Sequence, residues 1–413
     1  MFTLFEVNYP HLSPQSQLAI FAGLGLLLAF LNRPLHRSLE GNRALRGLDI
    51  ALAASAATIC GYVVVQTEPA FSSLWIGGES LGNRAGQEAP LDTAIGIVGL
   101  ILVLEAARRT IGWALPILAV VFLVYAGSGA SLPDGLFPHR GYGVTRIVAQ
   151  TFLHSQGVFG TALRVMFIYV FLFVLLGALL RKTGATQFII DFARRVLGNS
   201  PGGPAKVSVL SSGLMGSLSG SAVANTATTG TFTIPMMRSA GFKPEMAAGV
   251  EAAASSGGAL VPPVMGAGAY MMLEIIDPPV TYLQILRAAL IPAVLYYLSL
   301  LLIVHFYSRR IGLVEQRADD AKAEGGVWRF EGVVFLVGIA GLVMLLLRGY
   351  SVFRAASVCL LLVVVVSSLN RRTRLSFKTA IESLAQSARD MVPLIAAAAC
   401  VGIIIGVVTL TGI

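Results

Sequence analysis

The chain has 413 residues, of which 55% are hydrophobic and only 12% are Asp, Glu, Lys or Arg, so its surface cannot mainly face water. Its net charge of +9 comes from basic residues at the ends of apolar segments, which is typical of cytoplasmic loops and not of a nucleic-acid-binding stripe. Its cysteines stand far apart inside apolar runs and predict neither a disulfide framework nor a metal site. The composition therefore predicts an all-α polytopic membrane protein.

Ten apolar segments are predicted to cross the bilayer, because a hydrocarbon core of ~30 Å requires about 20 apolar residues of helix. The segments are 15–31, 48–65, 92–107, 111–128, 165–180, 245–273, 284–304, 331–347, 352–369 and a run that begins at 391. Basic residues follow every second segment, starting with the first, which places those loops in the cytoplasm. The amino terminus is then predicted to lie outside the cytoplasm. Glu105 has helical spacing to Arg108 and Arg109, which predicts an ordinary ion pair.

Residues 203–236 are predicted to form a re-entrant helical hairpin. Residues 207–237 carry no charge, and basic residues on both sides of them predict cytoplasmic flanks. Two crossings would need ~40 residues, more than this run provides, so two half-helices should enter and leave on the cytoplasmic side. Hydroxyl and amide side chains around 216–229 suit helix ends at the hairpin tip.

The next span, 245–273, is predicted to be a broken helix. Ser255-Ser256-Gly257-Gly258 is followed by Pro262-Pro263, and two prolines remove two main-chain donors. Carbonyl, hydroxyl and amide oxygens at such a break suit a small cation, and half-helix amino termini suit a carboxylate. Two alternatives remain at this point: the small residues could serve helix packing alone, and Glu251 could be structural or functional.

The residues of this region resemble the fused permease subunit of tripartite ATP-independent periplasmic (TRAP) transporters. The resemblance is carried by residues 202–207, 219–226, 234–237, 251–258 and 262–266. It is greatest to the branch whose partners are TAXI-type periplasmic binding proteins. The looser pattern of four leading spans with Glu105 extends the resemblance over most of the chain.

The resemblance implies an elevator-type transporter with two inverted repeats, which imports a small carboxylate delivered by the binding protein and is driven by an ion gradient, usually of Na⁺. It implies a small membrane domain at 1–130, an amphipathic connector at 131–164, a first repeat at 165–310, and a cytoplasmic linker with the start of a second repeat at 311–413. The ion-binding residues would be Ser219, Ser221, Asn225, Thr226, Ser256, Gly257 and Gly258. The substrate-cavity candidates are Gly220, Glu251, Pro262 and Pro263. No cofactor is expected, and the resemblance implies a location in the cytoplasmic membrane of a bacterium or archaeon.

The chain departs from the family pattern because it shows one hairpin signature where the family has two. The sequence therefore predicts a permease truncated at its carboxyl end, and a transport-inactive membrane fragment is an alternative function. A coupled-uptake activity is not expected from residues 1–413 alone. An intramembrane serine hydrolase is a rival of another class, but Ser219-Gly220 lacks the Gly of a nucleophile motif, and no histidine falls in the middle of a span.

Overall fold

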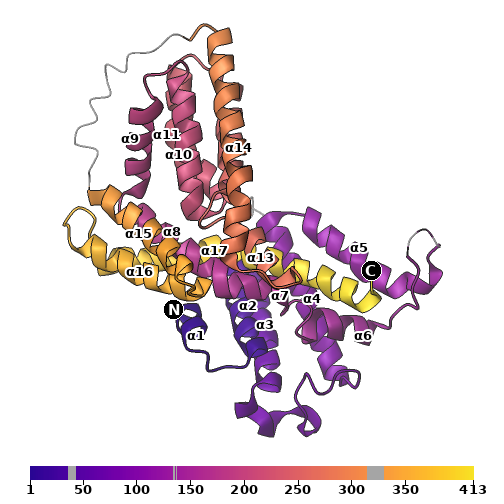
Figure 1. The fold of residues 1–413 in the computed structure, drawn as a ribbon. Coiled ribbons are helices and arrows are strands. Elements are labelled where there is room, and N and C mark those ends of the chain that lie inside the picture. Colours follow the sequence, from indigo (N-terminus) through magenta and orange to yellow (C-terminus); the bar gives the residue numbers. More distant parts are fainter. Residues whose placement is uncertain (36–42, 134, 136, 314–329) are drawn as a thin grey trace. The chain divides into compact units, whose positions relative to one another are not determined.

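The computed structural model describes residues 1–35, 43–133, 135, 137–313 and 330–413, and the secondary structure of these residues is helical without a strand (Figure 1). Eight of the described helices are long and apolar enough to cross a membrane. These are α2 (Pro14–Asn32), α3 (Arg43–Thr67), α4 (Pro90–Ile111), the run of α5 (Ala114–Ser128) with the turn η4 (Gly129–Ser131), the continuous run α7–η7–α8 (Thr161–Lys182), α14 (Tyr282–Arg310), α15 (Phe330–Leu347) and α17 (Phe377–Thr411). The predicted all-α polytopic membrane protein is confirmed.

The two remaining predicted spans have a different form. The segment predicted at 352–369 is α16 (Val352–Ser368), an apolar helix of 17 residues. The segment predicted at 245–273 is divided into α12 (Pro244–Gly257), η8 (Gly258–Leu260) and α13 (Ala267–Ile275). The break in this span is therefore confirmed. Most of the charged linker predicted from residue 311 lies outside the described residues.

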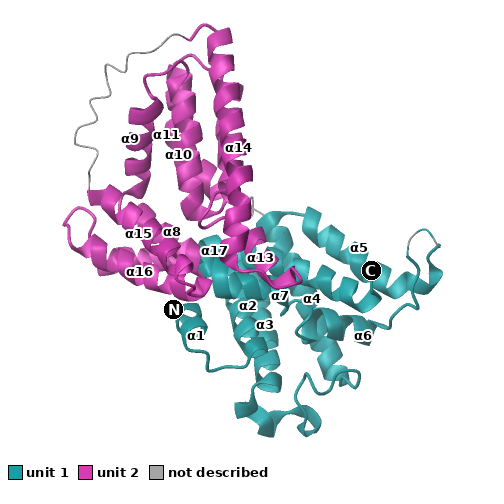
Figure 2. Cartoon of the chain, viewed as in Figure 1, with its two compact units in different colours: residues 1–171, 388–413 teal, residues 172–387 magenta. Residues whose placement is uncertain are grey.

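The chain divides into two compact units, coloured separately in Figure 2. Unit 1 comprises residues 1–171 and 388–413, and unit 2 comprises residues 172–387. The domain boundaries expected from the sequence stay predictions. Helix α17 is 35 residues long, supplies residues to both units, and contains Pro393 in its interior.

Unit 1 is a helical bundle in which α2 packs against α3 and α4, and α4 packs against α5. Glycines allow close approach of the carboxyl-terminal part of α17. A Cβ at Gly25 would lie 2.6 Å from the Ile395 side chain, and one at Gly402 would lie 2.4 Å from the carbonyl oxygen of Gly157. The unit also contains α1 (Phe2–Asn8), α6 (Val144–Val148) and the π-helical turn η6 (Ala149–Leu153). The predicted ion pair of Glu105 with Arg108 and Arg109 is present, with N–O distances of 2.7 Å.

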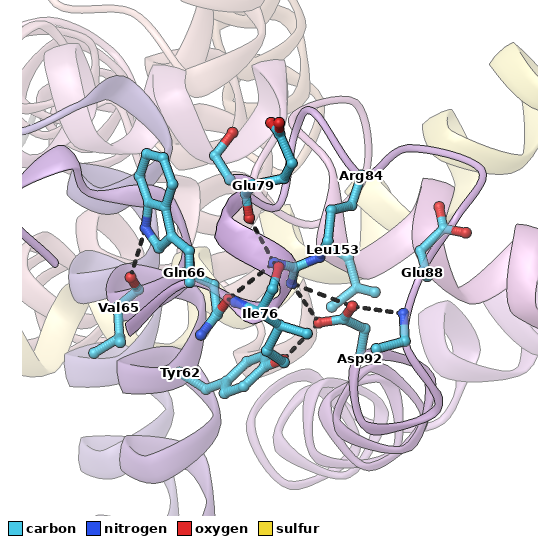
Figure 3. Close-up of polar contacts among 12 residues, drawn as sticks. Tyr62, Val65, Gln66, Ile76, Glu79, Arg84, Glu88, Asp92 and Leu153 are labelled. Carbon is cyan, nitrogen blue, oxygen red and sulfur yellow. Dashed lines mark hydrogen bonds and ion pairs between the residues drawn. The ribbon is translucent and has the colours of Figure 1, made fainter. Parts of the chain in front are cut away.

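The loop between α3 and α4, residues 68–89, is folded around a buried ion pair that the sequence reading did not predict (Figure 3). Arg84 is 7% exposed and lies 3.0 Å from the carboxylate of Asp92, which is fully buried. The Arg84 guanidinium also donates to Gln66 Oε1 at 3.0 Å and to the carbonyl oxygens of Ile76 and Glu79. Tyr62 and the main-chain amide of Ala89 donate to Asp92. The ion pair and its hydrogen bonds link the loop to the end of α3, at Gln66, and to the start of α4, at Asp92.

Unit 2 is arranged around α10 (Gly203–Ser219), which packs against α9 (Ala185–Leu197), α11 (Ala222–Ser239), α12 and α14. Helices α15 and α16 pack against each other, and α15 also contacts α9. Helix α9 is absent from the predicted spans, because its sequence is not uniformly apolar. It is amphipathic, with Ile189, Ile190 and Ala193 buried and Arg194 and Arg195 in its last turn.

Candidate functional site

The predicted hairpin is present as the antiparallel helices α10 and α11, which lie side by side in Figure 1 and meet at Gly220-Ser221. The arms have 17 and 18 residues, so each is roughly 26 Å long at 1.5 Å per residue. Together they span residues 203–239, against the predicted 203–236, and they include the basic residues Lys206 and Arg238 near their outer ends. Entry and exit on the cytoplasmic side stay a prediction.

The hairpin tip rests on the chain that follows the break in the next span. Gly220 has a φ of 57°, and a Cβ there would lie 1.9 Å from the carbonyl oxygen of Met265, so a larger residue would push the two segments apart. Ser221 caps α11, since its Oγ accepts a hydrogen bond from the amide of Ala224 at 3.3 Å. The Oγ of Ser219 accepts from the amide of Ser221 at 3.5 Å. The tip is therefore ordered by its own side chains.

Tyrosine hydroxyls satisfy carbonyl oxygens on both sides of the broken helix. On the α12 side, Tyr296 donates to Ala253 at 2.8 Å, and Tyr297 donates to Ala254 at 2.7 Å. On the other side, Tyr282 donates to the carbonyl oxygen of Pro263 at 2.6 Å. Tyr270 donates to Val264, and its ring stacks on Tyr282 with centroids 5.2 Å apart. These carbonyl oxygens already accept hydrogen bonds, so they are weaker candidate ligands for a cation than the unpaired carbonyl oxygens of an uncapped helix break.

Asn225 has a polar atom without a protein partner. Its side chain is 1% exposed, and its Nδ2 donates to the carbonyl oxygen of Ser212 at 2.8 Å. Its Oδ1 is buried and has no hydrogen-bond partner. The amide packs against the broken helix, since a Cβ at Gly258 would lie 2.9 Å from Nδ2. A Cβ at Gly216 would lie 2.2 Å from the Cα of Gly258, so the two backbones also touch here. A buried amide oxygen without a donor is costly unless a ligand meets it.

Glu251 joins the hairpin to α12. It is fully buried, and hydroxyl groups from three helices donate to its carboxylate. The donors are Ser208 to Oε2 at 2.6 Å, Ser212 to Oε1 at 2.9 Å, Thr229 to Oε1, Thr233 to Oε2 at 2.6 Å, and Ser255 to Oε1 at 2.9 Å. A side chain enclosed by its own hydroxyl shell is not open to a substrate, so the geometry favours a role inside the protein over the predicted place in the substrate cavity.

The other predicted ion-binding residues differ in their surroundings. The Thr226 hydroxyl donates to Ala222 at 3.0 Å, and the Ser256 hydroxyl donates to Ala252 at 2.8 Å, each within its own helix. Gly257 packs against Tyr296, because a Cβ there would lie 2.3 Å from its ring. The structure thus brings together Asn225 and Gly258, and separately Gly220 and the segment after Pro262-Pro263.

Two sets of site residues were missed by the sequence reading, the hydroxyl shell of Glu251 and the tyrosines at the break. The shell had a signal: Ser208 and Ser212, Thr229 and Thr233, and Glu251 and Ser255 are each four residues apart, which puts each pair on one helix face. The tyrosines had none, because they come from helices distant in sequence. No hydrogen bond joins Ser219 or Ser221 to any histidine in the described parts of the chain, so the geometry gives the serine hydrolase alternative no support.

The fold and this site define a polytopic membrane protein with a helical hairpin packed against a broken helix. Residues 98–413 match the family described as the tripartite ATP-independent periplasmic transporter, DctM component, and the chain belongs to that family. The family consists of transporter components and not of enzymes.

Several curated proteins are similar to this chain. The 2,3-diketo-L-gulonate TRAP transporter large permease protein YiaN of Escherichia coli (strain K12) is 28% identical over 198 residues, which are 47% of this chain and 44% of that protein. The C4-dicarboxylate TRAP transporter large permease protein DctM of Pseudomonas aeruginosa is 29% identical over 177 residues, 41% of this chain and 39% of that protein. The sialic acid TRAP transporter permease protein SiaT of Haemophilus influenzae is 33% identical over 140 residues, 34% of this chain and 22% of that protein. The matched segments thus span less than half of each relative.

Proposed function

We propose that this chain acts as the membrane permease of a TRAP transporter and imports a small organic anion, with Na⁺ as the coupling ion. Family membership supports the permease role. The single observation that supports the ion is the buried Oδ1 of Asn225, which lacks a donor at the contact between hairpin and broken helix. In transporters of this kind, ions and substrates bind near the middle of the membrane beside interrupted helices.

The proposed ion site is made of neutral oxygens. Asn225 supplies an amide oxygen, Ser219 and Ser221 supply hydroxyls at the tip, and Gly257 and Gly258 supply main-chain oxygens. Neutral oxygen ligands suit a monovalent cation, because a divalent ion generally requires carboxylates. Thr226 and Ser256 stay in the proposal as weaker candidates, since their hydroxyls already bond within their helices.

The proposed substrate is a carboxylate. The amino termini of α11, at Ala222, and α13, at Ala267, follow the two segments that touch at Gly220 and Met265. Helix amino termini carry partial positive charge and unpaired amides, which favour an anion. Gly220 and Pro262-Pro263 would border this cavity. The names of the relatives refer to a gulonate, a C4-dicarboxylate and sialic acid, so organic acids agree with the family. We also propose a periplasmic TAXI-type protein as the partner that delivers the substrate.

The test of the ion site is Asn225→Ala, with Thr228→Ala as the matched control. Thr228 lies on the same helix, and its hydroxyl donates to Ala224 at 2.7 Å. The purified protein in lipid nanodiscs is titrated with Na⁺, with K⁺ as reference, and the Na⁺-dependent rise in unfolding temperature is measured. Asn225→Ala is expected to raise the half-saturating Na⁺ concentration by about tenfold, and Thr228→Ala by less than about twofold. Equal behaviour of Asn225→Ala and the unaltered protein would reject the site.

The partner and substrate are tested by reconstitution into proteoliposomes with a TAXI-type binding protein. Accumulation of a labelled carboxylate should require the binding protein and an inward Na⁺ gradient together. Accumulation that follows a proton gradient and ignores Na⁺ would contradict the proposed coupling ion. Delivery by a binding protein of another type alone would contradict the proposed partner.

A further inference from the structure

Glu251 is a buried acidic group that the proposed ion ligands do not include. Buried carboxylates are normally paired with a cation, because desolvation of an isolated charge is costly. Among the described residues, no Lys, Arg or His forms an ion pair with Glu251, and its partners are neutral hydroxyls. The site around it therefore holds an acidic group without a basic side chain to balance it.

The hydroxyl shell supplies hydrogen-bond donors to both oxygens of this carboxylate. Five hydroxyls from described residues point to its two oxygens, at 2.6 Å for Ser208 and Thr233 and 2.9 Å for Ser212 and Ser255, with Thr229 as the fifth. An ionised carboxylate can accept from all of them, whereas a protonated one must use one oxygen as a donor.

Ser212 and Thr229 each contact both Glu251 and Asn225. Ser212 accepts from the Asn225 amide through its carbonyl oxygen at 2.8 Å and donates to Glu251 through its hydroxyl at 2.9 Å. Thr229 is one turn after Asn225, lies with its hydroxyl 2.9 Å from the Asn225 carbonyl oxygen, and also contacts Glu251. Only one residue, Ser212 or Thr229, thus lies between the Glu251 carboxylate and Asn225, whose Oδ1 has no hydrogen-bond partner. Across such a short path, opposite charges attract appreciably where the effective dielectric constant is low.

We infer that Glu251 is the counter-charge of a monovalent cation bound beside Asn225: the carboxylate does not touch the ion, and its negative charge offsets the positive charge brought into the protein. The inference rests on the proposed function and adds to it a charged positioning residue among neutral ligands. It explains why a site of neutral oxygens would hold Na⁺ in a protein interior. It also explains why Glu251 is bound by both arms of the hairpin as well as by its own helix, since its position sets the field at Asn225.

The test compares Glu251→Gln, which removes the charge at nearly constant shape, with Glu251→Asp, which keeps it. Each variant is purified in nanodiscs, and Na⁺ binding is followed through the Na⁺-dependent rise in unfolding temperature. Glu251→Gln is expected to raise the half-saturating Na⁺ concentration by roughly 10-fold or more, and Glu251→Asp is expected to stay within about threefold of the unaltered protein. An equal loss in both variants, or no loss in Glu251→Gln, would overturn the inference.

Ser211→Ala is the control for a merely structural role. Ser211 is buried on α10 and its hydroxyl donates to the carbonyl oxygen of Ser208 at 3.2 Å, so the variant leaves every hydroxyl partner of Glu251 in place. It should lower the unfolding temperature without moving the half-saturating Na⁺ concentration by more than about twofold. A shift as large as that of Glu251→Gln would show that packing of the helix and not the charge controls affinity, and would overturn the inference.

Infrared spectroscopy gives a second measurement that does not depend on the folding of Glu251→Gln. The unaltered protein should show an ionised carboxylate band that Glu251→Asp displaces, both with and without Na⁺. A protonated carboxyl band at this residue in the Na⁺-bound protein would overturn the inference. If the unaltered protein shows no Na⁺ effect at all, the proposed function itself fails; if Na⁺ stabilises it and only the Glu251 variants behave otherwise than expected, the counter-charge alone fails.

Discussion

The two compact units each bury a carboxylate, but the groups that surround it differ between them. In unit 1, Asp92 faces the guanidinium of Arg84 at 3.0 Å, so the charge is balanced by the protein itself (Figure 3). In unit 2, Glu251 faces only neutral hydroxyls among the described residues. The Arg84–Asp92 ion pair links two helices and a loop, and it requires no counter-ion from solution. The carboxyl group of Glu251 has no such partner among the described residues, and our inference assigns that part to a cation from solution.

The largest expected effect is the loss of the balanced pair. Arg84→Met leaves Asp92 buried without its cation and should destabilise the protein by about 3–5 kcal/mol. The measurement is the midpoint of denaturant unfolding in detergent. The double variant Arg84→Met/Asp92→Leu should recover most of the loss, because removal of both charges leaves none unpaired. Failure of the double variant to recover would mean that the remaining partners of Arg84, such as Gln66 and the carbonyl of Glu79, matter more than the ion pair.

Next in size is the backbone contact between Gly216 of the hairpin and Gly258 of the broken helix. Gly216→Ala would put a Cβ 2.2 Å from the Cα of Gly258, and such overpacking destabilises by about 1–3 kcal/mol. The matched control is Gly249→Ala in α12, where nothing lies within 4 Å of the added carbon. It should be neutral or stabilising by up to about 1 kcal/mol, because Ala favours a helix interior over Gly. Equal unfolding midpoints for the two variants would refute the close approach.

A smaller effect is expected at the tyrosines of the broken helix. Tyr297→Phe removes the donor to the carbonyl of Ala254, which is 2.7 Å away, and should cost about 1 kcal/mol in unfolding free energy. Tyr350, which is 49% exposed, provides the control: Tyr350→Phe should change the midpoint by a few tenths of a kcal/mol at most. A Tyr297→Phe variant as stable as Tyr350→Phe would show that the carbonyls at the break need no cap.

These predictions separate what the sequence could and could not indicate. Uniform apolar segments predicted the spanning helices, and the Gly257-Gly258 and Pro262-Pro263 pairs predicted the break, because both depend on local chemistry. The contact between Gly216 and Gly258 depends on how two helices pack, which periodicity does not specify. Asn225 was singled out as polar at a predicted tip; it lies instead in the first turn and a half of α11, and its unpaired oxygen is a property of the packed state.

The smallest effect concerns pH and the charged loop of unit 1. Burial acts to raise the pKa of Glu88, but hydrogen bonds from the Gly86 amide, its own amide and His154 outweigh burial and lower the pKa below its ordinary value of 4.5. A lowered folded-state pKa contributes stability above pH ~4.5 that is lost as the pH falls through the folded value. The unaltered protein should therefore lose a few tenths of a kcal/mol more than Glu88→Gln between pH 5 and pH 3. Parallel stability curves for the two proteins would contradict this assignment.

Helix α17 has a mechanical property that follows from its sequence. Its 35 residues form a rod of roughly 52 Å, longer than a bilayer core of ~30 Å. The charged residues of α17 lie in its amino-terminal part, from Phe377 to Asp390, and an apolar run follows. Pro393 stands just after this change, and its ring nitrogen cannot donate to the carbonyl of Arg389. Bending of α17 at Pro393 therefore breaks no further main-chain hydrogen bond. The helix can bend more easily here, where its polar part meets its apolar part, than elsewhere along its length.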